Sequence, residues 1–480
     1  MAVDKIFNVP DSLISRYHEE GDVLPQYRTQ FMRDRDRLMY ATAFRRLSGK
    51  TQIYTVGIDD HKKNRLTHTL EVSQIARTIA IALGFNTELA EAIALAHDFG
   101  HTPFGHAGER MLHDILIPDS IYIANSPFYK RSITEIRNRF EREKPSKIGS
   151  LEYIFGFKHN LQSVRVTALL EDSYRNQKSE NIGLNLTNFT LYGMMIHSAL
   201  KYNAEDRYPN FHNLFKDQMK LKDSEEFAWS FEAYIVKWAD DIAQWHHDLE
   251  DAMREGVLPL KKICSTIQES LSEALNAEDR IKLSDIEQVT LMDRKCIADL
   301  SHIVVNTLVN DLIATSERNF AELDKRLTDK GHINSQELFG KFDQLELGMK
   351  KEEIIMFSPK IKTNKFKDII KASIHHSRNV ERMNEKGKYI IRKLFEAYYA
   401  HPQQLPDGPI QHFLVDMKPE KYPNIDEIKK VGIGEARVEF DRIIRNPNVD
   451  VQCMLMRRIC DHIASMTDHY AIQEYNNLYG

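Results

Sequence analysis

The stretch HDFGHTPFGHAGE, from His97 to Glu109, concentrates residue types that can do chemistry. It carries three histidines and two carboxylates in thirteen positions. Imidazole nitrogens and carboxylate oxygens are ligands that divalent transition metals accept, and imidazole transfers protons near neutral pH. Gly100, Pro103 and Gly105 interrupt the stretch, so it cannot form one smooth helix. This composition favours a metal or acid–base site over a segment of the apolar core.

The segment before this stretch must deliver His97 and Asp98 to the end of a buried helix. It reads ELAEAIALAHD from Glu88 and is apolar and rich in strong helix formers. Ionisable side chains at such a position need a partner, because burying a charge or an unpaired imidazole costs free energy. A metal ion provides that partner, although a single histidine at a helix end is more often a residue that interacts with the helix dipole.

Two other segments with helical periodicity carry further ligand types. NRLTHTLEVSQIARTIAIALG places His68 in its first turns, and WADDIAQWHHDLEDAMREG carries Asp240 and Asp241 between apolar residues. Together with His97 and Asp98, these side chains form a mixed nitrogen and oxygen donor set on three helices. The sequence therefore predicts a metal site in the core of a helical bundle.

The composition sets loose bounds on the class of protein. With 480 residues and 42% hydrophobic content, the chain is long enough for one large domain or two. The formal net charge of −5 argues against a globally basic nucleic-acid binder but leaves local patches open. Four cysteines without CxxC spacing indicate neither a zinc ribbon nor a disulfide framework. We find no signal peptide and no apolar run that could span a bilayer, so we expect a cytoplasmic protein with no membrane partner.

The strand signal is weak along the whole chain, so the sequence predicts an all-α fold. Helical periodicity runs from Gln30 to Thr51 and again from Met454 to the C-terminus, where we expect one helix docked on the core. The first of these segments carries Arg45 and Lys50 near its end. Fixed cations beside a metal site suit a polyanionic substrate.

Seven segments of the chain, taken in order, resemble the deoxyguanosine triphosphate triphosphohydrolases, a branch of the HD-domain superfamily. They are FRRLSGKTQ, NRLTHTLEV, HDFGHTPFGHAGE, HNLQSVRV, GLNLT, ADDI and DHIASMTDHYA. The similarity runs from about Arg33 to the C-terminus, and HTPFGHAGE and GLNLT are its most specific parts. The resemblance implies a metal-dependent enzyme that hydrolyses deoxynucleoside triphosphates (dNTPs) to a deoxynucleoside and inorganic tripolyphosphate.

The resemblance also implies which side chains bind the metal and which act on the phosphate. The implied metal ligands are His68, His97, Asp98 and Asp240. Asp241 becomes the less favoured neighbour. The implied catalytic residues are the pair His106 and Glu109, with His101 as a second histidine that faces phosphate. We expect Mn²⁺ or Mg²⁺, and two imidazoles among the ligands would also accept Fe, Co or Zn.

Substrate contacts are carried over by position from the same resemblance. Gln52 corresponds to a residue that binds the 3′-hydroxyl of the sugar, and Asp248 corresponds to its partner. Gln244 stands where many relatives have a tyrosine that packs against the deoxyribose, so the stringency of sugar discrimination stays open. The positions implied to face the phosphates are Arg65, His159, Asn160 and Lys201.

The predicted organisation follows from the resemblance and the helical pattern. We expect a polar lead over 1–29, an HD-type core over 30–260 with an insertion at about 115–150, and a helical region over 261–480. The last region would pack on the core and complete the site. The resemblance further implies a homo-oligomer, either a hexamer or another assembly built from dimers.

Three functions stay open at this point. The first is a dNTP triphosphohydrolase, which a second nucleotide could activate. The second is another HD-domain phosphohydrolase, such as a phosphodiesterase or a nucleotidase. The third is a protein without turnover that senses nucleotides or binds single-stranded nucleic acid, and the intact His106 and Glu109 speak against it. The preferred dNTP does not follow from the sequence.

Overall fold

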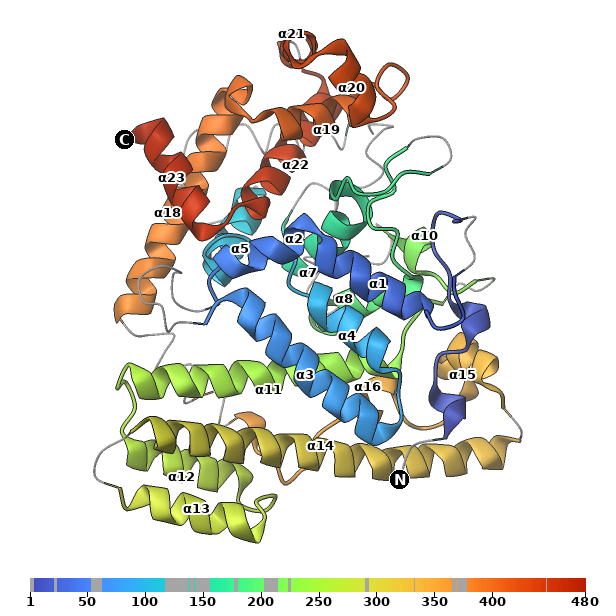
Figure 1. Ribbon diagram of the computed structural model, residues 1–480, viewed down its shortest axis with the longest axis vertical. Coiled ribbons are helices and arrows are strands. Elements are labelled where there is room, and N and C mark those ends of the chain that lie inside the picture. The colour runs from blue at the N-terminus through green and yellow to red at the C-terminus, as the bar shows by residue number, and fades with distance from the viewer. Residues whose placement is uncertain are drawn as a thin grey trace.

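The computed structural model shows a molecule built from helices (Figure 1). It describes residues 4–20, 24–52, 63–116, 138, 142, 156–176, 180–222 without 203–214, 226–289, 293–331, 333–364, 368, 378–445 and 447–480. In these parts of the chain no β-strand forms, and the extended segments make isolated bridges such as that between Thr51 and Asn64. The predicted all-α fold is confirmed, while most of the predicted insertion at about 115–150 lies outside the described residues.

The helices fall into long and short ones. The long ones are α1 (Gln30–Tyr40), α3 (Arg65–Leu83), α4 (Thr87–Ala96), α5 (Gly105–Leu116), α8 (Asn188–Tyr202), α11 (Phe231–Arg254), α12 (Leu260–Leu271), α13 (Ala277–Glu287), α14 (Arg294–Lys330), α18 (Arg378–Ala400), α19 (Asp407–Met417), α21 (Ile433–Ile444), α22 (Val449–Ser465) and α23 (Asp468–Tyr479). Shorter helices are α2 (Thr42–Arg46), α7 (His159–Arg165), α10 (Lys216–Met219), α15 (Ser335–Lys341), α16 (Lys351–Ile354) and α20 (Ile425–Val431).

Helices α3, α4 and α11 lie against one another at the centre of the fold (Figure 1). Each begins at a side chain that accepts a hydrogen bond from a backbone N–H of the first turn, which satisfies a donor that the helix itself cannot pair. These caps are Asn64, Asn86 and Ser230. Gly84 ends α3 in the left-handed conformation with φ of 82°, so the chain turns tightly into α4. Local sequence therefore sets where the three central helices start.

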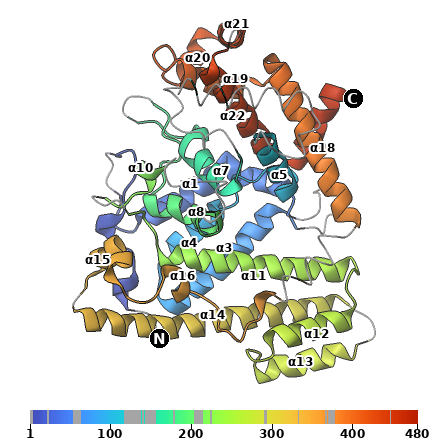
Figure 2. The same cartoon turned by 180° about the vertical axis from the view of Figure 1, so that it is seen from behind.

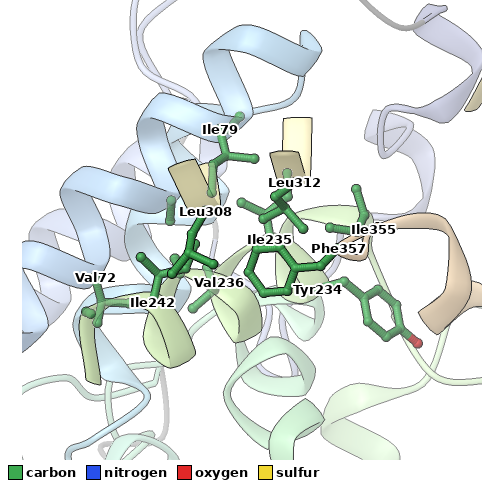
Figure 3. Close-up of a cluster of buried hydrophobic side chains, with 14 of the residues drawn as sticks. Val72, Ile79, Tyr234, Ile235, Val236, Ile242, Leu308, Leu312, Ile355 and Phe357 are labelled. Atoms are coloured by element: carbon green, nitrogen blue, oxygen red, sulfur yellow. The ribbon is translucent and has the colours of Figure 1, made fainter. Parts of the chain in front are cut away.

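A large apolar cluster holds these helices in place. Figure 3 shows side chains such as Val72, Ile235 and Leu308 meeting between α3, α11 and α14. Each of these side chains is almost fully removed from water. Burial of apolar area contributes roughly 25 cal/mol per Å², so this cluster is a main source of the stability that fixes α3 against α11.

Helix α14 also bears on the membrane expectation. Within the described residues it is the helix that is long and apolar enough to cross a membrane by length and composition. Polar residues such as Asn306 and Asp311 interrupt its apolar stretch, and the expected absence of a membrane partner stays a prediction. One such helix is weak support for a membrane protein, because core helices pass the same test, and Leu308 and Leu312 of α14 lie in the buried cluster.

The C-terminal helices form a second buried cluster around α5. Helices α18, α19, α22 and α23 contribute to it together with Leu112 and Ile115 of α5. Figure 2 shows these helices at the opposite end of the molecule from α12, α13 and α14. The first cluster contains residues from Phe7 to Val380, so it includes side chains from both sides of position 260. The three predicted domain ranges stay predictions.

Two segments that we expected to be single helices are divided. Ala41 separates α1 from α2, and its ψ of 146° is extended. Met466, with ψ of 152°, separates α22 from α23, and the Thr467 hydroxyl then caps α23 by accepting from Tyr470 N. The expectation of one helix in each place is wrong. Alanine and methionine both favour helices, so neither breaking residue gives a signal, although Thr467 after the second break is a typical N-cap residue.

A buried carboxylate joins the C-terminal helices to α7. Asp461 on α22 accepts hydrogen bonds from Arg165 Nε and Nη2 at 2.8 and 2.7 Å, and from Gln162 Nε2 at 3.0 Å. Burial acts to raise the pKa of Asp461, but Arg165 and Arg457 hold it well below its usual range. The ion pair therefore persists in the interior and fixes α7 against α22.

We expect Asp461→Ala to destabilise the fold strongly. The substitution leaves the buried Arg165 without its partner, and breaking a buried pair in this way costs about 3–5 kcal/mol. Asp441→Ala is the matched control, because Asp441 pairs with the exposed Arg445 at 2.7 Å and surface pairs contribute little. Thermal and chemical unfolding should separate the two variants clearly. Equal stability of both variants would contradict this view of α7.

Candidate metal centre and active site

The predicted metal ligands converge from three elements. His68 lies in the first turns of α3, and its Nε2 is 2.9 Å from Asp240 Oδ1 on α11. His97 ends α4, and its Nε2 lies 3.4 Å from Asp98 Oδ1 and 3.7 Å from Asp240 Oδ1. Ligand atoms of His68, His97 and Asp98 all lie within 4.8 Å of one another. The structure brings the four side chains together.

The hydrogen bonding of His97 leaves the correct nitrogen for a metal ion. His97 Nδ1 lies 2.7 Å from Ala94 O, and because a carbonyl oxygen only accepts, Nδ1 carries the proton. The lone pair of Nε2 then faces the carboxylates of Asp98 and Asp240. Buried lone pairs that face each other need a cation or a proton between them. This donor set fits a divalent metal ion.

The carboxylates of the centre stay ionised although they are buried. Burial acts to raise the pKa of Asp98, but His97, His101 and Arg65 hold it well below its usual range. Asp240 behaves in the same way because two histidines face it. Burial acts to lower the pKa of His97, yet Asp98 and Asp240 raise it to about 9. The centre therefore has a negative potential that favours positive charge.

Arg65 and His101 connect the centre to the loop that precedes α5. Arg65 Nη1 donates to Asp98 Oδ2 at 2.7 Å, and His101 Nε2 lies 3.1 Å from Asp98 Oδ1. Burial, followed by the charge of Arg65, holds the pKa of His101 well below its usual value, so this imidazole is neutral. Gly105 has φ of 55°, and a Cβ there would come within 3.2 Å of Arg65 Nη2. The glycine lets the loop close over Arg65.

Glu109 contacts a second cluster of histidines. Its Oε2 lies 3.0 Å from both His106 Nδ1 and His159 Nδ1, and Lys158 Nζ lies 2.8 Å from its Oε1. Burial acts to raise the pKa of Glu109, but His159, His106 and Lys158 hold it well below its usual range. His159 stacks on His101 with ring centroids 3.8 Å apart. This stacking joins the second cluster to the metal centre.

His106 is placed for proton transfer. Its side chain is 59% exposed, whereas that of Glu109 is 7% exposed. Because the carboxylate accepts from Nδ1–H, the Nε2 of His106 is the atom that can exchange a proton with substrate or water. A Cβ at Gly100 would lie 2.1 Å from His159 O, so only glycine lets α7 approach this closely. The close approach puts His159 beside His106 and Glu109 of α5.

A series of side-chain hydrogen bonds links three polar residues beside Asp240 of α11. Gln52 Nε2 donates to Gln244 Oε1 at 2.6 Å, and Gln244 Nε2 donates to Asp248 Oδ1 at 2.6 Å. Burial raises the pKa of Asp248 to about 8, although the bond from Gln244 acts to lower it. Gln244 and Asp248 follow Asp240 by four and eight positions. Helical spacing thus puts Gln244 and Asp248 on the side of α11 that bears Asp240, and Gln52 reaches them from the segment before α3.

Two predicted phosphate contacts are not placed at these clusters. Asn160 is buried, and its Nδ2 donates to Met194 O on α8 at 3.3 Å. This bond sets Asn160 against a helix and not against a metal ligand, so its substrate role stays a prediction. The side chain of Lys201 lies outside the described residues.

Comparison with known proteins covers nearly the whole chain. Residues 65–153 match the model of the HD domain, and residues 355–417 and 438–477 match that of the Phosphohydrolase-associated domain. The deoxyguanosinetriphosphate triphosphohydrolase-like protein of Bartonella henselae is 30% identical over 96% of this chain and 92% of its own length. Its namesakes in Azoarcus sp. and Geobacter metallireducens are also 30% identical, over 97% of this chain and 94% and 92% of their own lengths. The chain belongs to this family.

The chain is thus an HD-domain phosphohydrolase, and its cluster of histidines and carboxylates can hold a divalent metal ion. Sequence reasoning about this phosphohydrolase missed Glu71 and His247. His247 Nε2 contacts Glu71 Oε2, and the Nδ1 atoms of His247 and His68 lie 3.3 Å apart. Burial lowers the pKa of His247 to about 4, although Glu71 acts to raise it. The available signal was helical spacing, since Glu71 follows His68 by three positions.

We expect Asp98→Ala to lose its metal ion. The substitution removes one of the four proposed ligands and one of the two carboxylate charges that would balance the charge of the ion. Asp241→Ala is the matched control, since Asp241 is the acidic neighbour that the ligand assignment leaves out. Elemental analysis of both proteins, purified without chelators, measures the metal content. Full occupancy in Asp98→Ala, or loss of metal in Asp241→Ala, would contradict the ligand assignment. Circular dichroism checks that both variants are folded.

Proposed function

We propose that this phosphohydrolase cleaves dNTPs between the 5′ oxygen and the α-phosphorus, releasing a deoxynucleoside and inorganic tripolyphosphate. The observation that carries this proposal is the stacking of His159 on His101, which joins a metal centre to an acid–base cluster. The name of the relatives, deoxyguanosinetriphosphate triphosphohydrolase-like protein, supports the same reaction class.

The reaction needs three things from the protein. A water molecule must attack phosphorus, charge on the phosphoryl oxygens must be neutralised, and the leaving alkoxide must gain a proton. The residues that would hold the metal ion are His68, His97, Asp98 and Asp240. A divalent cation at this position, for which Mn²⁺ or Mg²⁺ is our assignment, supplies Lewis-acid neutralisation and orientation of the phosphate.

Proton transfer falls to His106. Glu109 accepts from its Nδ1 and holds the imidazole in one tautomer, so the exposed Nε2 can give or take a proton at the reacting phosphate. His159 and Lys158 contact the same carboxylate and keep it ionised. Arg65 is a donor on the side of the metal centre and would contact phosphoryl oxygens. The one N–H of the neutral His101 faces Asp98, so His101 would act beside the phosphate by holding that carboxylate in place.

The side chains of Gln52, Gln244 and Asp248 would bind the sugar of the substrate. A deoxyribose hydroxyl can replace either amide bond among Gln52, Gln244 and Asp248, because all three side chains combine polar atoms at hydrogen-bond distance. Gln244 offers hydrogen bonds and no aromatic surface. In our proposal, sugar selection therefore depends on polar contacts and not on stacking against a ring.

We expect tripolyphosphate as the inorganic product of dNTP turnover. The test incubates the purified protein with each dNTP singly and with mixtures, in Mn²⁺, Mg²⁺ or Co²⁺, and separates the products by ion chromatography. Mixtures show whether one nucleotide activates hydrolysis of another. Orthophosphate or a nucleoside monophosphate would instead indicate another kind of HD-domain phosphohydrolase. No turnover under any condition would indicate a nucleotide-sensing or nucleic-acid-binding protein.

We expect His106→Ala to keep its metal ion and its fold while the single-turnover rate falls roughly 10²–10⁴-fold, the scale for loss of a positioned acid–base group. His302→Ala is the control, because His302 is an exposed histidine on α14. Rapid-quench hydrolysis and metal content are measured on the same samples. An unchanged rate would remove His106 from the mechanism, and loss of metal would make it a ligand.

A further inference from the structure

Glu71 and His247 form a polar pair at the contact between α3 and α11. Glu71 follows His68 on α3, and His247 follows Asp240 on α11 by seven positions, about two helical turns. The same two helix faces therefore carry both a metal ligand and a member of this pair. The side chain of His247 is 1% exposed, and that of Glu71 is 37% exposed. The pair lies behind His68, with the His68 and His247 ring centroids 5.2 Å apart.

The hydrogen bonds of this pair determine where the protons sit. The Glu71 carboxylate only accepts, so the contacting Nε2 of His247 carries a proton. A buried neutral imidazole has one N–H, which leaves Nδ1 of His247 as an acceptor. The Nδ1 atom of His68 lies 3.3 Å from it and must donate. His68 Nε2 then presents its lone pair toward Asp240 Oδ1, 2.9 Å away.

The opposite arrangement of protons is unfavourable. If His68 carried its proton on Nε2, its Nδ1 would have to accept from Nδ1 of His247. The Nε2 lone pair of His247 would then face the carboxylate of Glu71. Lys63 Nζ lies 3.2 Å from the other oxygen of Glu71, so the carboxylate lies between an ammonium and the His247 imidazole. The charge on Glu71 therefore sets which nitrogen atoms of His247 and His68 donate and which accept.

We propose that Glu71 and His247 are positioning residues that fix the tautomer and ring orientation of His68 so that its Nε2 binds the metal ion. This inference rests on the metal centre of the proposed function and adds two residues that touch neither the ion nor the substrate. Partners of this kind raise the basicity of an imidazole ligand, and their loss typically weakens metal binding 10–100-fold.

The test is a metal titration that does not use turnover. Protein stripped with a chelator is titrated with Co²⁺ followed by visible absorption, and with Mn²⁺ followed by electron paramagnetic resonance. His247→Leu removes the acceptor, and Glu71→Gln keeps the shape but removes the charge. His246→Leu is the matched control, because His246 Nε2 lies 3.8 Å from the same Glu71 oxygen, which is beyond hydrogen-bond distance.

We expect His247→Leu to bind both ions about 10–100-fold more weakly, with a changed Co²⁺ spectrum because one imidazole is no longer oriented. The metal affinity of Glu71→Gln should lie between that of His247→Leu and that of the unaltered protein. His247→Asn should recover part of the affinity, since its amide oxygen can accept from His68. His246→Leu should bind both ions as the unaltered protein does.

Unaltered affinity and an unaltered Co²⁺ spectrum in His247→Leu would overturn the inference. If that variant does not fold, as judged by circular dichroism, Glu71→Gln decides, because its side chain is partly exposed; unaltered affinity there would overturn the inference equally. Asp98→Ala in the same titration keeps this inference apart from the metal centre. Tight binding by Asp98→Ala would reject the centre itself, whereas loss of binding there and retention in His247→Leu would reject the positioning role alone.

Discussion

The ionised carboxylate of Asp98 is the constraint on which the rest of the site depends. It is buried, and it contacts Arg65 from α3, His97 from α4 and His101 from the following loop. A carboxylate removed from water in this way stays ionised because cations and hydrogen-bond donors surround it. Three chain segments thus meet at one side chain. Their meeting places the lone pairs of the histidine ligands around a common position.

From this centre the structure extends to the acid–base cluster through contacts between helices. His101 stacks on His159, and His159 contacts the Glu109 carboxylate that also orients His106. Helix α7 begins at His159 and ends at Arg165, and the ion pair between Arg165 and Asp461 fixes it against α22. The C-terminal helices therefore act on the site through the position of α7. In this way a site built from residues in the first 250 positions is linked to helices near the C-terminus.

Much of this could be predicted from residue types and spacing. The metal ligands belong to residue types with a strong preference for metal ions, and apolar periodicity assigned them to helices. Glu71 and His247 could not be found in this way, because their role depends on a contact between two helices. The breaks at Ala41 and Met466 were missed because no glycine or proline ends those helices. The substrate role of Asn160 stays a prediction, since the bond that the structure gives it is to α8.

The location of the metal ion tests the account most directly, because three clusters in the described residues could hold one. Besides the ligands of the proposed centre, two groups bring their ligand atoms within 4.8 Å of one another: His101, His106, Glu109 and His159, and Glu71, His246 and His247. Anomalous diffraction at the manganese edge, from crystals grown with Mn²⁺ and a non-hydrolysable dNTP analogue, locates the ion. Our account predicts a peak bound by His68, His97, Asp98 and Asp240, with the α-phosphate beside it and His106 outside the coordination shell. A peak bound by His106 and Glu109 would contradict it.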